Sequence, residues 1–264
     1  METWRNRLDV APVPLSIRQT VASTGETIYW PTDAPHGGIV CLHGSEGGWA
    51  GWNDLYCALF AAHGFAALSR NYTRKAQWLT HPDIDDVPLE GTETALAAMR
   101  TEMAPFGCGT GLFGISRGAE HALLVAQLLV EDCCAEVPDA VAVHSPPDAA
   151  WPAFIVADFQ TGEPWAGDLT RPAWSWRGAH VRTRPGTPLC PGTVPYPVFI
   201  AQGTDDRTWD ADMARRLVAR MTEHRCSPEA HFFEGKDHIF RAAARNREWE
   251  LMADFFAKHL AERA

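Results

Sequence analysis

The sequence predicts an α/β fold with a mostly parallel central sheet that is covered by helices on both faces. Two observations support this prediction. Short apolar runs that end near glycine or proline recur along the chain, and helix-like patterns alternate with them. The length of 264 residues suits one large domain, so we expect a single domain over residues 1–264.

The first elements differ from the alternating pattern that follows. Residues 15–23 and 26–32 flank a Thr24-Gly25 turn signal and predict an antiparallel hairpin, so we assign residues 1–36 to an N-terminal hairpin region. The remaining predicted strands are short and apolar, as expected of strands buried on both faces. They are residues 37–44, 65–72, 110–115, 139–146, 196–203 and 229–235.

Helical patterns separate these strands. The first predicted helix ends at Gly64, the third is strongly apolar, and the last is amphipathic. The predicted helices are residues 53–64, 90–103, 118–132, 211–224 and 243–263. The carboxyl ends of parallel strands meet at one edge of such a sheet, which is where functional sites of this fold class lie.

The alternation stops over residues 146–197. This segment holds a dense share of the nineteen prolines together with Trp151, Trp165, Trp174 and Trp176. A stretch of this length without regular structure is typical of a functional insertion, so we expect a Trp/Pro-rich, lid-like insertion here.

Charge and composition exclude several classes of function. The net charge of −10 argues against nucleic-acid binding and against a basic membrane surface, and no apolar window is long enough to cross a bilayer. The N-terminus lacks the features of a secretory signal. The seven cysteines are odd in number and form no CxxC pair, so we expect free thiols, no metal site, no cofactor and a cytoplasmic location.

Ser116 is the candidate nucleophile. It is the central residue of Gly114-Ile115-Ser116-Arg117-Gly118, a G-x-S-x-G motif between a predicted strand and a predicted helix. A sharp strand-to-helix turn holds such a serine in strained backbone angles, and flanking glycines remove the side chains that would collide there. The alternative is that Ser116 only caps the helix.

A serine nucleophile needs a base and an acid, which follow it in the order acid, then histidine. His238 follows the last predicted strand on a loop and is the candidate base, whereas His224, His231 and His259 fall within or at the end of regular elements. Two adjacent residues after residues 196–203, Asp205 and Asp206, are candidate acids. Spacing from the preceding glycine favours Asp206.

The loop LHGSEGGW follows the first buried strand and is rich in glycine. Backbone N–H groups from this position, with the amide after the nucleophile, form the oxyanion hole of such enzymes. The candidate donors are Arg117 and either Ser45 or Glu46. The loop lacks the Lys-Ser/Thr ending of a Walker motif, which argues against a phosphate-binding loop.

Two stretches, FGISRGAEHALL and GTDDRTWDADMARRL, resemble the catalytic domain of the acyl-CoA thioesterase and bile acid-CoA:amino acid N-acyltransferase family. PAWSWRG is also similar to a segment of that family, and the resemblance covers about residues 38–260. LHGSEGG instead resembles dienelactone-hydrolase-like esterases. The resemblance implies the α/β-hydrolase fold, with Ser116 as nucleophile, Asp206 as acid and His238 as base. Unlike eukaryotic members, which carry an N-terminal β-sandwich domain, this chain has only a short hairpin before Gly37.

These features predict a serine acyl hydrolase that cleaves a small-molecule ester or thioester. An acyltransferase with the same triad and an amine or alcohol acceptor is the alternative, and a degenerate hydrolase that only binds a partner is a third possibility. Aromatic side chains could seat a substrate or pack a lid. The candidate substrate-binding residues are Trp49, Trp174, Trp176 and Trp209. The sequence leaves the oligomeric state open.

Overall fold

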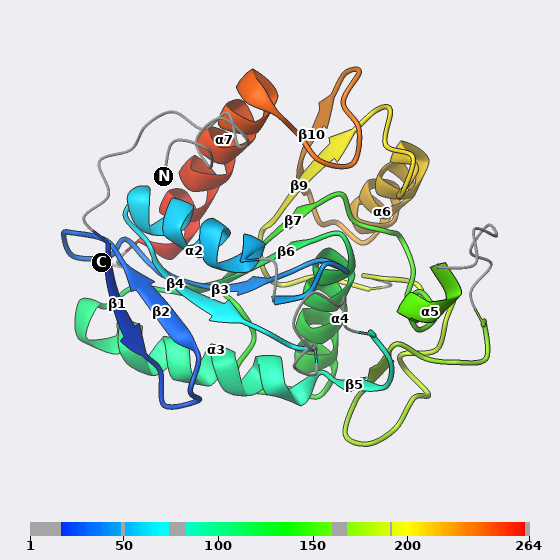
Figure 1. Ribbon diagram of the computed structural model, residues 1–264, viewed down its shortest axis with the longest axis horizontal. Helices are drawn as coiled ribbons and strands as arrows, with labels where there is room; N and C mark the ends of the chain where they lie inside the picture. The colour runs from blue at the N-terminus through cyan, green and yellow to red at the C-terminus, as the bar shows by residue number, and fades with distance from the viewer. Residues whose placement is uncertain (1–16, 49–50, 74–82, 160–167, 191, 262–264) are drawn as a thin grey trace.

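The computed structural model describes residues 17–48, 51–73, 83–159, 168–190 and 192–261, and an eight-stranded sheet forms the centre of this part of the chain (Figure 1). The strands are β1 (Arg18–Val21), β2 (Thr27–Trp30), β3 (Gly38–Leu42), β4 (Ala66–Arg70), β6 (Thr110–Ile115), β7 (Ala140–His144), β9 (Val198–Gly203) and β10 (Glu229–Phe233). Their order is β1-β2-β4-β3-β6-β7-β9-β10.

Strand direction follows the sequence pattern. All neighbours from β4 to β10 pair in parallel, whereas β1 pairs with β2, and β2 with β4, in antiparallel fashion. The prediction of a mostly parallel sheet is therefore confirmed. Each strand from β3 to β9 is followed by a helix or a long connection, as parallel neighbours require.

Helices cover both faces of the sheet (Figure 1). They are α2 (Trp52–Ala62), α3 (Glu90–Met103), α4 (Arg117–Glu131), α6 (Ala211–Glu223) and α7 (Ala242–Leu260), with a short 3₁₀ turn, η2, at Ala104–Phe106. Alternate residues of one strand face opposite cores, because side chains alternate along a strand. Val40 of β3 packs into the core formed with α3, α4 and α6, and Ile39 into the core formed with α2 and α7.

The region that breaks the alternation contains little regular structure. Within residues 146–197 the structure describes α5 (Val156–Phe159) and β8 (Trp174–Ser175), whereas residues 160–167 and 191 lie outside the described part. β8 pairs in parallel with β5 (Val87–Pro88), a strand that the sequence pattern did not indicate. This pairing attaches the segment to the connection that precedes α3.

Across the described residues, no helix combines the length and the apolar character that a membrane span needs.

α4 is buried on nearly every side because it lies between the sheet and residues 146–197. His121, on this helix, is fully buried, and its Nε2 bonds the Thr92 hydroxyl at 2.8 Å. Burial, with the neighbouring charges of Arg70 and Arg117, holds the pKa of His121 well below its ordinary value of 6.5. The ring is therefore neutral in the folded protein at neutral pH.

The approach of α4 to the sheet depends on Gly118. A Cβ at this position would lie 2.3 Å from the His43 carbonyl oxygen and 2.6 Å from that of Leu42, both backbone atoms. We expect Gly118→Ala to lower the free energy of unfolding by about 1–3 kcal/mol, because helix and strand must move apart. Gly192→Ala is the matched control, since a Cβ there meets no atom within 4 Å. Urea denaturation measures both, and equal stabilities would contradict the packing argument.

The buried neutral His121 predicts a pH dependence of stability. Below pH 6.5 the unfolded chain binds a proton at this residue that the folded chain does not, so stability falls as the pH falls below 6.5. The slope of the unfolding free energy against pH measures how many more protons the unfolded chain binds than the folded chain. We expect His121→Gln to reduce this difference by about one proton. His224→Gln, at an exposed histidine that ends α6, is the control. Unfolding free energies measured from pH 7 to pH 4 test this, and an unchanged slope in His121→Gln would refute it.

Candidate active site

Ser116 occupies a sharp turn between β6 and α4. Its backbone angles are φ 55° and ψ −119°, a conformation that costs free energy for any residue with a Cβ. A Cβ on Gly114 would lie 2.1 Å from the Gly118 carbonyl oxygen, so glycine is required on the strand side of the turn. Within the described part of the chain, the Ser116 side chain makes no capping bond to α4. The geometry is that of a strained nucleophile turn rather than of a simple cap.

The Ser116 backbone is fixed by the neighbouring strand. Its N–H donates to the His144 carbonyl oxygen at 2.9 Å, which continues the β6–β7 ladder by one residue. The Ser116 carbonyl in turn accepts from the Ala119 and Glu120 amides and starts α4. The residue is 6% exposed, so its hydroxyl lies near the surface of a closely packed edge.

Asp206 and His238 form a bonded pair at the same edge of the sheet. Asp206 Oδ2 lies 2.8 Å from His238 Nδ1. The same oxygen accepts from the Gln202 side-chain amide at 3.0 Å, and Asp206 Oδ1 accepts from the backbone N–H groups of Thr208 and Trp209. Because Asp206 accepts at both oxygens, His238 carries its proton on Nδ1, which leaves Nε2 as an acceptor.

The ionised form of Asp206 is favoured. Burial raises its pKa, but the hydrogen bond and charge of His238, with the two backbone donors, more than compensate, so the pKa lies below its ordinary value. The carboxylate side chain is fully enclosed, whereas that of His238 is 17% exposed. The arrangement suits an anion that orients an imidazole and stabilises its charged form.

The other candidates lie elsewhere. Asp205 is exposed and accepts from the Thr204 hydroxyl at 3.2 Å, so the structure brings Asp206, and not Asp205, to His238. His231 bonds Glu229 on β10, His224 ends α6, and His259 lies on α7 beside Phe255.

Trp209 joins Ser116 to the Asp206–His238 pair. Its indole Nε1 donates to Ser116 Oγ at 3.2 Å, while its backbone N–H donates to Asp206 at 2.9 Å. The Trp209 ring meets Trp151 edge-on, with 4.7 Å between centroids. Because Ser116 Oγ accepts from the indole, its own hydroxyl hydrogen is available to another acceptor.

The glycine-rich loop after β3 lies beside this edge. The Tyr72 hydroxyl donates to the His43 carbonyl at 2.8 Å and fixes the start of the loop, and the His43 and Tyr72 rings stack with 4.0 Å between centroids. Glu46 Oε1 accepts from the Gly44 N–H at 3.0 Å. Burial raises the pKa of the Glu46 carboxyl group. The hydrogen bonds from backbone N–H groups and the charge of His238 act in the opposite direction and reduce this rise. Gly44 therefore donates to Glu46, and the next amides, of Ser45 and Glu46, are the loop's candidate oxyanion donors.

The second candidate donor is the Arg117 amide, which is the first of α4 and has no intrahelical acceptor by helix geometry. The Arg117 side chain points away from this role. It pairs with the fully buried Glu120 at 2.8 Å and donates to the Pro152 carbonyl at 3.1 Å. Glu120 also accepts from the Trp151 N–H and the Trp174 indole. The Arg117–Glu120 pair therefore anchors Trp151, Pro152 and Trp174 to the helix that follows Ser116.

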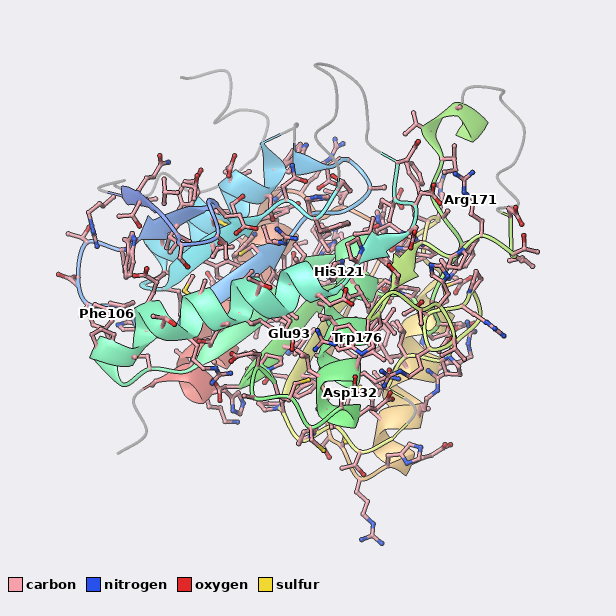
Figure 2. All side chains as sticks on the ribbon, turned by 90° about the horizontal axis from the view of Figure 1, so that it is seen from below. Glu93, Phe106, His121, Asp132, Arg171 and Trp176 are labelled. Carbon is pink, nitrogen blue, oxygen red and sulfur yellow. The ribbon has the colours of Figure 1, made fainter. Side chains whose placement is uncertain are left out.

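Three of the candidate substrate-binding tryptophans lie in the described part, and Trp49 lies outside it. Trp174 is fully buried with its indole N–H on Glu120, and Trp176 is 2% exposed with its indole N–H on Asp132. Figure 2 shows Trp176 close to Asp132, at the far end of α4. These contacts support packing for Trp174 and Trp176, whereas Trp209 contacts the candidate nucleophile directly.

Sequence reasoning did not single out the residues that hold these groups. Gln202 and Tyr72 lie at the ends of predicted strands, and their residue types alone do not indicate a role in a site. His144 lies within a predicted strand and matches no catalytic motif. Their position after strands at one sheet edge was the available signal. Among the described residues, no cluster of three or more His, Cys, Asp or Glu is arranged to bind a metal ion.

No family model matches the chain. Curated relatives include acyl-coenzyme A thioesterase 6 of Mus musculus, 38% identical over 101 residues, which are 38% of this chain and 23% of that protein. Acyl-coenzyme A thioesterase 6 of Homo sapiens is 26% identical over 270 residues, which span 87% of this chain and 62% of that protein. The chain thus spans less than two thirds of either relative.

Solved structures with a similar fold include a Pyrobaculum calidifontis esterase, with a TM-score of 0.64, 14% identity and coverage of 97% of this chain and 89% of that one. Thermogutta terrifontis esterase 2 gives a TM-score of 0.62 at 18% identity, over 96% of this chain and 98% of that one. A dienelactone hydrolase-like phosphotriesterase from metagenomic libraries gives a TM-score of 0.59 at 15% identity, over 93% of this chain and 99% of that one. The chain therefore has the fold of these esterases, and acyl-coenzyme A thioesterases are among its sequence relatives.

Proposed function

We propose that this protein is a serine acyl hydrolase that cleaves an ester or thioester through an acyl-enzyme. The observation that carries the proposal is the strained turn at Ser116 beside the bonded Asp206–His238 pair. The Thermogutta esterase, which shares the fold, has also been solved phosphoramylated by tabun, and it is only 18% identical to this chain in sequence. The function of this chain therefore rests on its own site geometry.

In the acylation step, His238 Nε2 takes the proton of the Ser116 hydroxyl as Oγ attacks the acyl carbonyl carbon. The negative charge that develops on the carbonyl oxygen is met by the Arg117 amide and by the amide of Ser45 or Glu46. Asp206 stabilises the charged imidazole. His238 then returns the proton to the leaving alcohol or thiol as the bond to the acyl carbon breaks, leaving the acyl group on Ser116 Oγ.

Deacylation repeats the sequence with water. His238 Nε2 removes a proton as the water oxygen attacks the acyl carbon, and the same amides hold the oxyanion. His238 then protonates Ser116 Oγ, and the free acid leaves. One base thus serves both half-reactions without any change in the positions of Asp206 or Ser116.

The thioesterase relatives favour an acyl-CoA thioester as the substrate. A thiolate leaves more readily than an alkoxide, so the catalytic demand on His238 as an acid is smaller for a thioester than for an alkyl ester. The short hairpin before β3 and the insertion of residues 146–197 belong, on this proposal, to one hydrolase domain, with the insertion acting as a lid. The seven cysteines, all within the described ranges, are free thiols, which supports a cytoplasmic enzyme.

Acyl transfer to an amine or alcohol is the second candidate. Trp209, in contact with Ser116 Oγ and packed on Trp151, is an apolar wall at the nucleophile that would exclude water and favour another acceptor. Incubating the enzyme with an acyl-CoA and a panel of amines separates the two reactions. Free acid alone supports hydrolysis, and amide products support transfer.

Replacement of the two adjacent aspartates should give very different results. We expect Asp206→Asn to lower kcat by about 10⁴-fold, because the amide no longer holds the imidazole in the required tautomer. Asp205→Asn should remain within about threefold of the wild type, because the Asp205 side chain is exposed and accepts from the neighbouring Thr204 hydroxyl rather than meeting His238. Steady-state hydrolysis of a short acyl-CoA measures both, and equal effects would contradict the assignment of the acid.

The nucleophile is tested by Ser116→Ala. We expect turnover of an activated acyl ester to fall by about 10⁴-fold or more, with the unfolding transition preserved. Labelling with a fluorophosphonate should add one adduct to the wild type, at Ser116 by peptide mass spectrometry, and none to the variant. Full activity in Ser116→Ala, or an adduct at another residue, would end the proposal. A wild type that neither turns over nor labels would favour a protein that only binds.

A further inference from the structure

His144, the last residue of β7, contacts two members of the candidate triad. Its carbonyl oxygen accepts from the Ser116 N–H at 2.9 Å, and its side-chain Nε2 lies 2.7 Å from the His238 carbonyl oxygen. Ser145, at φ 49°, donates its hydroxyl to the same carbonyl at 3.2 Å. One residue therefore connects the nucleophile turn to the backbone of the candidate base.

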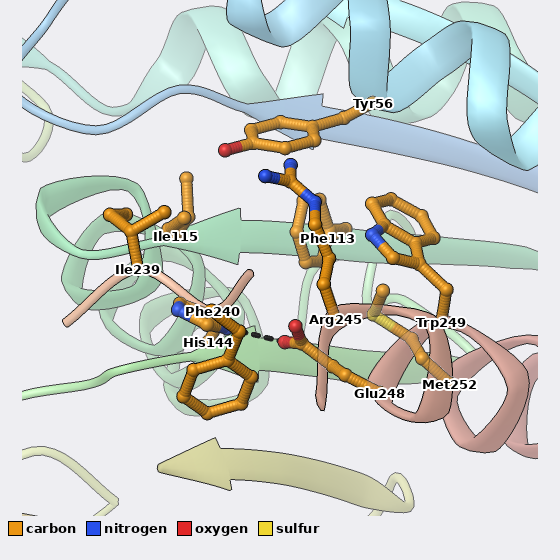
Figure 3. Close-up of a pocket in the computed structure, with 10 residues that line it drawn as sticks. All are labelled: Tyr56, Phe113, Ile115, His144, Ile239, Phe240, Arg245, Glu248, Trp249 and Met252. Atoms are coloured by element: carbon orange, nitrogen blue, oxygen red, sulfur yellow. Dashed lines mark hydrogen bonds and ion pairs between the residues drawn. The ribbon is translucent and has the colours of Figure 1, made fainter. Parts of the chain in front are cut away.

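The two ring nitrogens of His144 both face acceptors. Nδ1 bonds the Glu248 carboxylate (Figure 3), and Nε2 lies 2.7 Å from the His238 carbonyl oxygen. A neutral imidazole has a single N–H, whereas the charged ring has two, so opposite an ionised Glu248 carboxylate only the charged ring donates to both acceptors. Burial lowers the pKa of His144, but the charge and bond of Glu248 and the bond to His238 outweigh it, and the net shift is upward.

The pair is enclosed. The His144 and Glu248 side chains are 5% and 6% exposed, and the cavity beside them is lined mainly by apolar side chains. Two other ionisable groups face this cavity, Arg245 of α7, whose charge opposes protonation of His144, and Tyr56 of α2 (Figure 3). A buried ion pair often stabilises a fold no more than well-packed apolar side chains of similar volume would. Its position beneath the His238 loop indicates another role.

Phe240 adds a second restraint on the same loop. Its ring packs edge-on against His144, with 4.6 Å between centroids and 68° between planes. The loop is thus held through the carbonyl of residue 238 and the ring of residue 240, both on His144. The imidazole of His238 is held from its other side by Asp206.

We propose that His144, charged and fixed by Glu248, is a positioning residue that holds the main chain of His238 in place for proton transfer to and from Ser116. The proposal rests on the proposed hydrolase function. His144 touches no reacting atom and acts through the His238 carbonyl. Its loss would leave the Asp206 and Ser145 contacts in place but remove the shorter of the two hydrogen bonds to the His238 carbonyl, together with the ring that packs against Phe240.

The test compares two double variants. His144→Leu with Glu248→Leu replaces the ion pair by apolar side chains, which are compatible with a stable fold, but removes the ring donor to the His238 carbonyl and leaves only the Ser145 hydroxyl. His144→Gln with Glu248→Gln also removes both charges but retains an amide N–H that reaches the same carbonyl. His231→Leu with Glu229→Leu is the matched control, because this is also a histidine–glutamate pair but lies on β10, where the two side chains bond each other.

We expect the leucine pair to lower kcat, and the rate of fluorophosphonate labelling, by about 10–100-fold, since a displacement of about 1 Å can cost about 10²-fold. KM and the thermal unfolding midpoint should stay close to the wild type. The glutamine pair and the control should keep kcat within about threefold. Wild-type kcat in the leucine pair, or an equal loss in the glutamine pair, would overturn the proposal.

A measurement on the wild type covers the case in which the leucine pair does not fold. In protein labelled with ¹⁵N-histidine, both ring nitrogens of His144 should carry protons at pH 7, with the signal assigned by its loss in His144→Gln. A neutral His144 ring would overturn the proposal. Failure of the underlying function has a different signature, namely wild-type protein that neither hydrolyses an acyl ester nor labels at Ser116.

Discussion

The turn at Ser116 is the constraint on which the rest of the site depends. The chain must pass from β6 into α4 within one residue, and this is possible only because Gly114 and Gly118 let the strand, the helix and the end of β3 approach one another. The same approach brings the Arg117 amide and the loop after β3 beside the serine. A strained residue persists only where the surrounding structure holds it, and here the β7 ladder bond to His144 does so.

Two separate groups of charged residues surround this turn. In the first, the Asp206 carboxylate accepts hydrogen bonds from Gln202, Thr208, Trp209 and His238, so both of its oxygens are bonded within the site. Arg117 and Glu120 form a second, buried pair that points away from Ser116 and bonds Trp151, Pro152 and Trp174. The helix that begins after the candidate nucleophile therefore also anchors these residues.

Much of the fold was predictable, and the candidate triad could be selected, because each element and each candidate residue carries a local signal. The order of strands and helices follows from hydrophobic periodicity, and Ser116, Asp206 and His238 follow strands within recognisable turns. The β5–β8 pairing was not predictable, since two-residue strands have no periodicity. His144 and Glu248 were missed for a related reason, since their importance lies in a contact between residues 104 positions apart, which leaves no pattern in either segment. Gln202 bonds Asp206 only four positions away, but a glutamine within an apolar strand gives no signal of that contact.

By itself, the sequence determined a parallel sheet, a glycine-flanked serine at a strand end and a short set of acid and base candidates. Periodicity, turn residues and motif spacing are properties of neighbouring positions, and they are present before the chain folds. Only the tertiary structure decided that Asp206 rather than Asp205 meets His238, that Trp174 and Trp176 are packed away, and that Trp209 reaches Ser116. Those outcomes depend on which side chains are brought within bonding distance and which are desolvated, and both are set when the strands assemble.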